Sequence, residues 1–281
     1  VTGTALTAIG RGSLQNNTAG GNTAIGYLSA YNNTSGSGIT AIGNSASYSN
    51  TTGGNNTSLG AGALYTNSTG SQNTAIGYSA LSSTTGGANT GVGYLSMSSN
   101  STGQENTAMG SRVLLSNTTG NQNSAFGGLA LYLNSIGSGN TAMGYFSLFS
   151  NNADSNTAIG YYAGYGNTSG TTLTAIGYES LRNNTTGNNN TGLGHQTLYN
   201  NTTGGGNTAI GRNAGNDNTT GNSNQVIGAF NQTGNFSNVS MIGYNDLATG
   251  NNQMRFGSAS NNNGAVSTEV NTSSKVWNVF I

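Results

Sequence analysis

The chain has 281 residues, of which only 4% are charged; 47 are glycine, and proline and cysteine are absent. The formal net charge is zero and the six basic residues are scattered, so the chain lacks the basic stripe that nucleic-acid binding requires. The lack of cysteine excludes a disulfide framework and a thiolate metal site. No apolar run approaches the roughly 20 residues of a membrane-spanning helix, so we expect no membrane insertion.

Apolar residues make up 33% of the chain and are placed with a regular period, which argues against disorder. The motif Asn-Thr-Ala-Ile-Gly recurs from Gly10 onward. Its glycines are 16 or 17 residues apart as far as Gly228, and then 15 and 14 apart as far as Gly257. A second marker, Asn-Thr-Thr-Gly or a variant, follows most of these glycines, for example at Asn50 and Asn117. A period kept over many copies is the signature of a stacked repeat architecture.

Each copy contains a short segment of β-strand character. Thr stands two positions before a large apolar residue, with a small residue between them. Side chains alternate faces along a strand, so Thr and the large apolar residue share one face. Frequent Gly, Asn and Thr argue against helices and favour tight turns. The sequence predicts an all-β β-solenoid or β-roll of about sixteen rungs, with two short strands in each 16–17-residue repeat.

The large apolar residue before each motif glycine is predicted to form a core ladder inside the stack. Its members are Ile9, Ile25, Ile42, Leu59, Ile76, Val92, Met109, Phe126, Met143, Ile159, Ile176, Leu193, Ile210 and Ile227. A leucine four residues after the glycine is expected to join them. Residues 1–257 would then form the repeat shaft, and residues 258–281 a C-terminal strand segment that caps the shaft or leads to a further domain.

The core of a single rung is thin. Ordering one rung costs roughly 17–34 kcal/mol of backbone entropy, whereas two or three large apolar side chains return about 1.5–3 kcal/mol each. The position between Thr and the large apolar residue is nearly always Ala, Ser or Gly, which indicates that another surface approaches closely. Three chains around one axis would supply that surface and protect the sheet edges, so we expect a homotrimer.

The segments at residues 22–26 and 73–77, both Asn-Thr-Ala-Ile-Gly, resemble the head repeats of trimeric autotransporter adhesins, as do Ala80 and Ser96 three residues after a motif glycine. The resemblance implies left-handed parallel β-rolls in which three chains lie side by side. The longer rung with its Asn-Thr-Thr-Gly insertion is more similar to repeat-bearing tail-fibre proteins of phages and surface fibres of bacteria. Residues 252–258 and 275–281 look like the exit from such a shaft.

Two columns of tyrosine accompany the repeat. Tyr directly after the motif glycine forms a candidate surface ladder that either stacks rung on rung or contacts a ligand such as a glycan. Its members are Tyr27, Tyr78, Tyr94, Tyr145, Tyr161 and Tyr178. The only histidine, His195, takes the same place in its rung and is predicted to be a variant of this column. A second column lies five residues after the glycine, at Tyr31, Tyr48, Tyr65, Tyr132 and Tyr199.

The acidic residues occupy different positions of the repeat: Glu105, Asp154, Glu179, Asp217, Asp246 and Glu269. This placement suits neither the paired carboxylates of a glycosidase nor the fixed Asp of a calcium-binding β-roll. We therefore expect no catalytic residue, no cofactor and no metal site. The many Asn-x-Ser/Thr sequons would be glycan acceptors in a eukaryotic secretory protein, but are interpreted here as turn chemistry.

The function predicted from these features is that of a structural fibre segment. It would be a rigid extracellular or virion shaft that supports adhesion or host-receptor binding, with a cell-surface glycan or receptor as a further partner. An ice-binding solenoid is the alternative, because ranked Thr residues on a flat sheet can match an ice lattice. The objection to it is that Thr shares a face with the supposedly buried Ile and should point inward. A glycan-binding or glycan-degrading spike is a lesser alternative.

Overall fold

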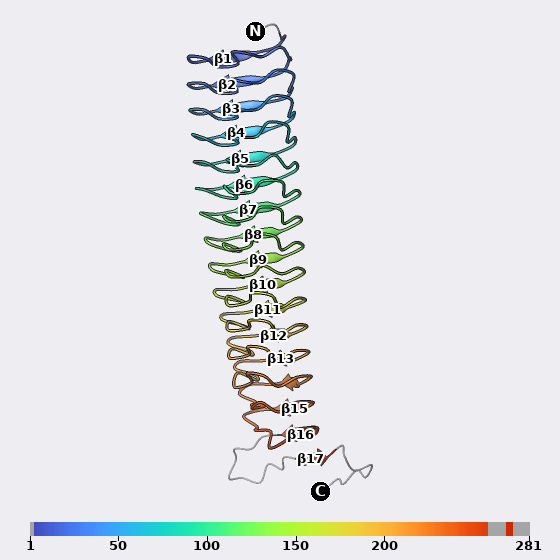
Figure 1. The fold of residues 1–281 in the computed structure, drawn as a ribbon. Helices are drawn as coiled ribbons and strands as arrows, with labels where there is room; N and C mark the ends of the chain where they lie inside the picture. The colour runs from blue at the N-terminus through green and yellow to red at the C-terminus, as the bar shows by residue number, and fades with distance from the viewer. Residues whose placement is uncertain (1–2, 258–267, 272–281) are drawn as a thin grey trace. The chain divides into compact units, whose positions relative to one another are not determined.

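The computed structural model describes residues 3–257 and 268–271, which form strands and turns without a helix. The chain divides into two compact units, Val1–Asn140 and Thr141–Ile281. Within each unit, Figure 1 shows a stack of coils, each carrying its strand on the same side. The predicted β-solenoid with a repeat of about 17 residues is thereby confirmed.

Each coil contributes one short strand. The first unit holds β1 Thr7–Ile9, β2 Thr23–Ile25, β3 Thr40–Ile42, β4 Thr57–Leu59, β5 Thr74–Ile76, β6 Thr90–Val92, β7 Thr107–Met109 and β8 Ser124–Phe126. The second unit holds β9 Thr141–Met143, β10 Thr157–Ile159, β11 Thr174–Ile176, β12 Thr191–Leu193, β13 Thr208–Ile210, β14 Gln225–Ile227, β15 Ser240–Gly243, β16 Gln253–Gly257 and β17 Thr268–Asn271.

Consecutive strands pair in parallel and in register, from β1 to β8 in the first unit and from β9 to β16 in the second. Thr40 of β3, for example, lies between Thr23 of β2 and Thr57 of β4. Because equal positions stack, each position of the repeat becomes a column of side chains one strand spacing apart, about 4.7–4.9 Å.

The predicted core ladder is wrong. From β2 to β13 the small residue in the middle of each strand points inward, and Ala41 and Ala75 are fully buried. None of the predicted ladder residues is buried. Ile9, Leu59, Met109, Met143, Leu193, Ile210 and Ile227 are exposed, and Ile25, Ile42, Ile76, Val92, Phe126, Ile159 and Ile176 are half-buried. Thr and the large apolar residue do share a face, but that face points out of the coil.

The leucine four residues after the motif glycine fills the coil instead. Leu64 and Leu81 are fully buried against the inward strand residues. A Cβ placed on Gly91, which replaces Ala in β6, would lie 3.1 Å from the Leu81 Cγ, so the interior has room only for a small side chain there. The close surface that the small residues indicated is therefore the opposite wall of the same coil. This feature gives no support to a homotrimer.

The opposite wall is a series of tight turns, so each coil has one strand and not the predicted two. Leu64 and Leu81 adopt left-handed backbone conformations, with φ of 52° and 50°. Such a conformation costs a non-glycine residue about 1–2 kcal/mol. Hydrogen bonds between coils offset that cost, as in the bond from the Leu64 N–H to the Ala80 carbonyl at 3.0 Å. Turn rules assign positive φ to Gly and Asn, which is why the sequence did not predict it at Leu.

The motif glycine is required by both its conformation and its surroundings. Gly60 has a φ of 139°, which L-residues rarely adopt. A Cβ on Gly60 would also collide with the carbonyl of Gly77 in the next coil. The chain therefore needs glycine at the point where each strand ends and the turn begins.

Two buried asparagine columns hold successive coils together. In the motif column, the Asn73 Nδ2 donates to the Gly86 carbonyl at 2.9 Å, and the Asn73 Oδ1 accepts the Asn89 N–H at 3.0 Å. In the loop column, the Asn117 Nδ2 donates to the Gly120 carbonyl at 3.0 Å and to an asparagine of the preceding coil. All of these side chains are fully buried. The interior thus combines apolar side chains with two columns of hydrogen-bonded amides, in which the buried Asn67 Oδ1 and Asn134 Oδ1 accept no hydrogen bond.

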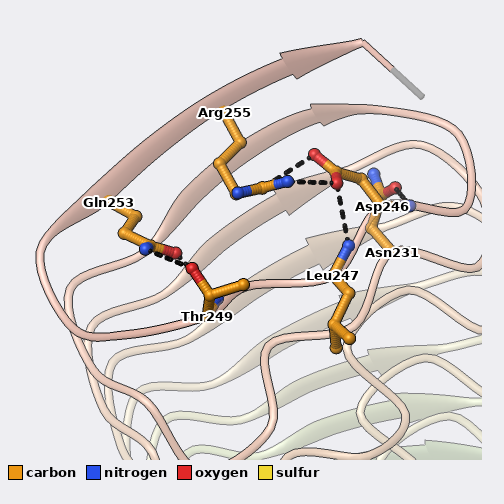
Figure 2. A network of polar contacts seen from close by, with 6 residues as sticks. All are labelled: Asn231, Asp246, Leu247, Thr249, Gln253 and Arg255. Atoms are coloured by element: carbon orange, nitrogen blue, oxygen red, sulfur yellow. Dashed lines mark hydrogen bonds and ion pairs between the residues drawn. The ribbon is translucent and has the colours of Figure 1, made fainter. Parts of the chain in front are cut away.

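The last coil of the second unit has a charged interior (Figure 2). Arg255 occupies the inward position of β16, in register with Met241 of β15. Its Nη2 and Nε donate to the two carboxylate oxygens of Asp246 at 2.7 and 3.0 Å, and both residues are buried. β17 then pairs with β16 in the antiparallel sense, which ends the run of parallel strands. The remainder of the predicted C-terminal segment, residues 258–267 and 272–281, lies outside the described residues.

Candidate functional surface

Within each unit, the outward side of the strands forms a continuous surface, which we call the Thr–Ile face. It consists of the first and third residues of each strand triplet, such as Thr57 and Leu59 of β4. Leu59 and Met143 are each 45% exposed, and Ile9 is 58% exposed. From β1 to β16 these two positions hold Thr, Ser, Gln, Ile, Leu, Val, Met or Phe and no charged residue. The face is therefore regular, uncharged and largely apolar.

The threonines of this face differ from those of the loops. Loop hydroxyls bond to the neighbouring coil: the Thr51 Oγ1 donates to the Ser68 carbonyl at 2.9 Å, and the Thr118 Oγ1 donates to the Ser135 carbonyl at 2.9 Å. The strand hydroxyls from Thr7 to Thr107 form no such internal bond in the described coils. Their hydrogen-bonding capacity is left for solvent or a ligand.

Five of the six predicted tyrosines after the motif glycine stack rung on rung; Tyr27, whose neighbouring coils carry Arg11 and Asn44 at this position, does not. In the second unit, Tyr161 lies between Tyr145 and Tyr178, with ring centroids 6.0 and 5.4 Å away and nearly parallel planes. His195 continues the stack on Tyr178 at 5.1 Å, as its repeat position predicted. In the first unit Tyr78 and Tyr94 stack at 5.6 Å. Because stacked rings cover one another's faces, the ladder presents ring edges outward, and a sugar has little ring face to stack on.

The second aromatic column also stacks, with Tyr48 between Tyr31 and Tyr65 at 5.5 and 5.3 Å. Farther along, Phe149 and Tyr165 stack at 5.2 Å in the same position. Aromatic packing of this kind contributes about 0.5–1.5 kcal/mol per pair beyond the area it buries. Both columns thus stabilise the coils they join, which agrees with the first of the two interpretations that the sequence left open.

A cluster in the second unit joins Glu179, Arg182, Gln196 and Tyr199. The Arg182 Nη1 donates to the Tyr199 hydroxyl at 2.6 Å and lies 3.3 Å from the Glu179 Oε1. The Gln196 Nε2 donates to the other Glu179 oxygen at 2.7 Å. Desolvation alone would lower the pKa of the Arg182 guanidinium, but its bond to Tyr199 and the charge of Glu179 raise it. The guanidinium also lies over the Tyr162 ring, 5.0 Å from its centroid. The four side chains thus bond to one another across two neighbouring coils, while the buried Arg182 Nε has no hydrogen-bond partner.

Glu105 and Asp217 lie outside this cluster. The Glu105 Oε2 accepts from the Gln122 Nε2 at 3.0 Å. The Asp217 carboxylate accepts the backbone N–H groups of Thr233 and Gly234 at 3.0 and 2.9 Å. Within residues 3–257 and 268–271, no three His, Asp or Glu side chains gather as a metal site would require. In that same part of the chain, no helix has the length and apolar character needed to cross a bilayer.

The sequon asparagines fall into two groups. Asn50 and Asn117 lie in the buried loop column, where their side-chain nitrogens bond to protein oxygens. An N-linked glycan at either nitrogen is incompatible with this fold. Asn16 and Asn55, each of which is the first residue of an Asn-x-Thr sequon, are exposed. The turn interpretation therefore holds for the buried group.

No protein-family model, no curated protein and no solved structure matches this chain. Its surface is therefore interpreted from its own geometry.

Proposed function

We propose that this chain is a structural fibre segment: a stiff extracellular or virion shaft that holds an adhesive or receptor-binding part away from its base. The observation that supports it is the uninterrupted, in-register stacking of coils within each unit. Neighbouring coils are bonded by the backbone and, in many of them, also by buried amides and stacked rings, so bending would strain these contacts. The resemblance of the repeat motif to that of adhesin heads and phage tail fibres points in the same direction.

A homotrimer remains part of this proposal, with a different contact from the one that the small residues indicated. On the outward side of β14–β16 the Thr column is replaced by Gln225, Ser240 and Met254. There Ile227, Ile242, Met254 and Phe256 line a shallow apolar hollow. An exposed apolar patch of this kind is typical of a protein–protein interface. We propose that this hollow receives a second copy of the chain.

The mass in solution and the shape in electron micrographs test the fibre proposal. We expect a trimer and elongated particles. Ile242→Glu should yield monomers, because Ile242 lines the hollow and is 50% exposed. Ile9→Glu, on the outward side of the first unit, is the matched control and should leave the trimer intact. Globular particles would refute the shaft, whereas a trimer unaffected by Ile242→Glu would refute only the proposed contact.

A glycan or receptor as partner, and a glycan-degrading activity, are not favoured by any particular site in the described residues. The objection to the ice-binding alternative was that the strand threonines would point inward. They point outward, so that objection no longer applies.

A further inference from the structure

The Thr–Ile face of β1–β5 is the most regular surface of the first unit. The outward residues are Thr in all five strands, followed by Ile in four and Leu in one. The strands pair in register, so Thr7, Thr23, Thr40, Thr57 and Thr74 form one column. The apolar residues form a second column alongside it. No other outward stretch of the first unit repeats the same pair of residues so closely.

The hydroxyls of this column are available to a ligand. None of the five donates an internal hydrogen bond, whereas the loop hydroxyls of Thr34 and Thr51 in the same coils donate to carbonyls at 2.9 Å. The difference is not one of burial, because both sets are half-buried or exposed. The strand side of each coil therefore presents one free hydroxyl, held by a rigid backbone, next to one branched apolar side chain.

The spacing of these hydroxyls is close to that of water molecules in ice. Hydrogen-bonded oxygens lie about 2.75 Å apart, and tetrahedral bonding then places second-neighbour oxygens about 4.5 Å apart. Strands in a sheet lie about 4.7–4.9 Å apart. The difference of roughly 0.3 Å per coil accumulates to about 1.2 Å over the four intervals of β1–β5, less than half of one hydrogen-bond length. A short run of coils can therefore match the lattice, whereas a long run cannot.

The chemistry of the face suits ice better than a charged or strongly hydrated ligand. It carries no ion, so it holds no tightly bound hydration shell that would disrupt the lattice. The adjacent apolar column orders water without bonding to it, and the hydroxyls can join that ordered layer. We infer that the Thr–Ile face of β1–β5 binds ice. This function goes beyond the fibre proposal and uses a surface distinct from the β14–β16 hollow.

Thermal hysteresis and the shape of growing ice crystals test the inference on the full chain. We expect the wild type to shape ice and to lower the freezing point relative to the melting point at micromolar concentration. The double variant Thr40→Leu/Thr57→Leu removes two hydroxyls from the centre of the column and adds bulk, so it should lose more than half of that activity. Its circular dichroism spectrum and melting temperature should stay close to those of the wild type, because both side chains point outward.

The matched control is Thr52→Leu/Thr119→Leu, which makes the same change at two exposed loop positions. It should retain the wild-type hysteresis. A folded wild type without hysteresis or ice shaping would overturn the inference, and so would an equal loss in both double variants. Neither result bears on the fibre proposal, which the solution mass and micrographs decide separately.

Discussion

Asn50 and Asn33 are joined across neighbouring coils: the Asn50 Nδ2 donates to the Asn33 Oδ1 at 2.8 Å, and both side chains are fully buried. The same Asn50 nitrogen donates to the Gly53 carbonyl at 2.9 Å. One amide thus closes its own loop and bonds to the coil before it. Repeated along the stack, this arrangement makes each coil depend on its neighbour.

Asn50→Ala should be strongly destabilising. It leaves the Asn33 Oδ1 and the Gly53 carbonyl buried without this donor, at a cost of about 1–3 kcal/mol for each group. We expect a loss of roughly 2–4 kcal/mol in the free energy of unfolding, measured by urea denaturation. Asn44→Ala is the control: Asn44 is exposed, so its removal should change stability by no more than about 0.5 kcal/mol. Equal effects at the two positions would contradict the ladder.

Ala41→Leu and Ile42→Ala test the orientation of the strands. Ala41 is fully buried against the opposite wall, so the larger side chain should overpack the coil and cost about 1–3 kcal/mol or more. Ile42 is half-buried on the outward face, and its truncation should cost about 1 kcal/mol or less. Thermal unfolding of both variants shows which substitution lowers the stability more. A larger loss for Ile42→Ala would restore the original prediction of a core ladder.

The strand orientation shows what the sequence could and could not predict. The spacing of Gly10, Gly26 and their successors predicted the repeat, the solenoid and the columns of equal residues. The alternation of Thr, Ala and Ile established that Thr40 and Ile42 share a face, but alternation alone does not say which face is inside. The leucines of the opposite wall, in left-handed conformations, fill the interior and leave the Thr and Ile side of the strand outside. No local sequence pattern predicts the positive φ at Leu64. The Thr–Ile face was missed for this reason.

Thr172→Gly should stabilise the second unit or leave it unchanged. Thr172 is exposed with a φ of 59°, a conformation that is strained for a β-branched residue. The same repeat position holds glycine at Gly139 and Gly206. Relief of about 1–2 kcal/mol of strain outweighs the 0.5–1 kcal/mol that glycine adds in unfolded-chain entropy, so we expect a gain of up to about 1 kcal/mol.

Thr186→Gly is the control for that measurement. Thr186 is an exposed loop threonine outside the left-handed region, so glycine brings only its entropic cost of about 0.5–1 kcal/mol. The midpoint of chemical denaturation should therefore fall for Thr186→Gly and either rise or stay unchanged for Thr172→Gly. A shift of Thr172→Gly to lower denaturant, equal to that of Thr186→Gly, would show that the turn imposes no strain.

Arg255→Ala tests the charged interior of the last coil. The Asp246 carboxylate is 2% exposed, and removal of its partner leaves a buried charge that costs about 3–5 kcal/mol. The double variant Arg255→Met/Asp246→Asn removes both charges, places Met beside Met241 of β15, and keeps an oxygen for the Leu247 N–H that Asp246 accepts at 2.9 Å. We expect its stability to lie within about 1 kcal/mol of the wild type, because a buried ion pair is often replaceable by neutral groups of similar size. If the double variant lost as much stability as Arg255→Ala, the last coil would need the ion pair itself, and not merely a filled and neutral interior.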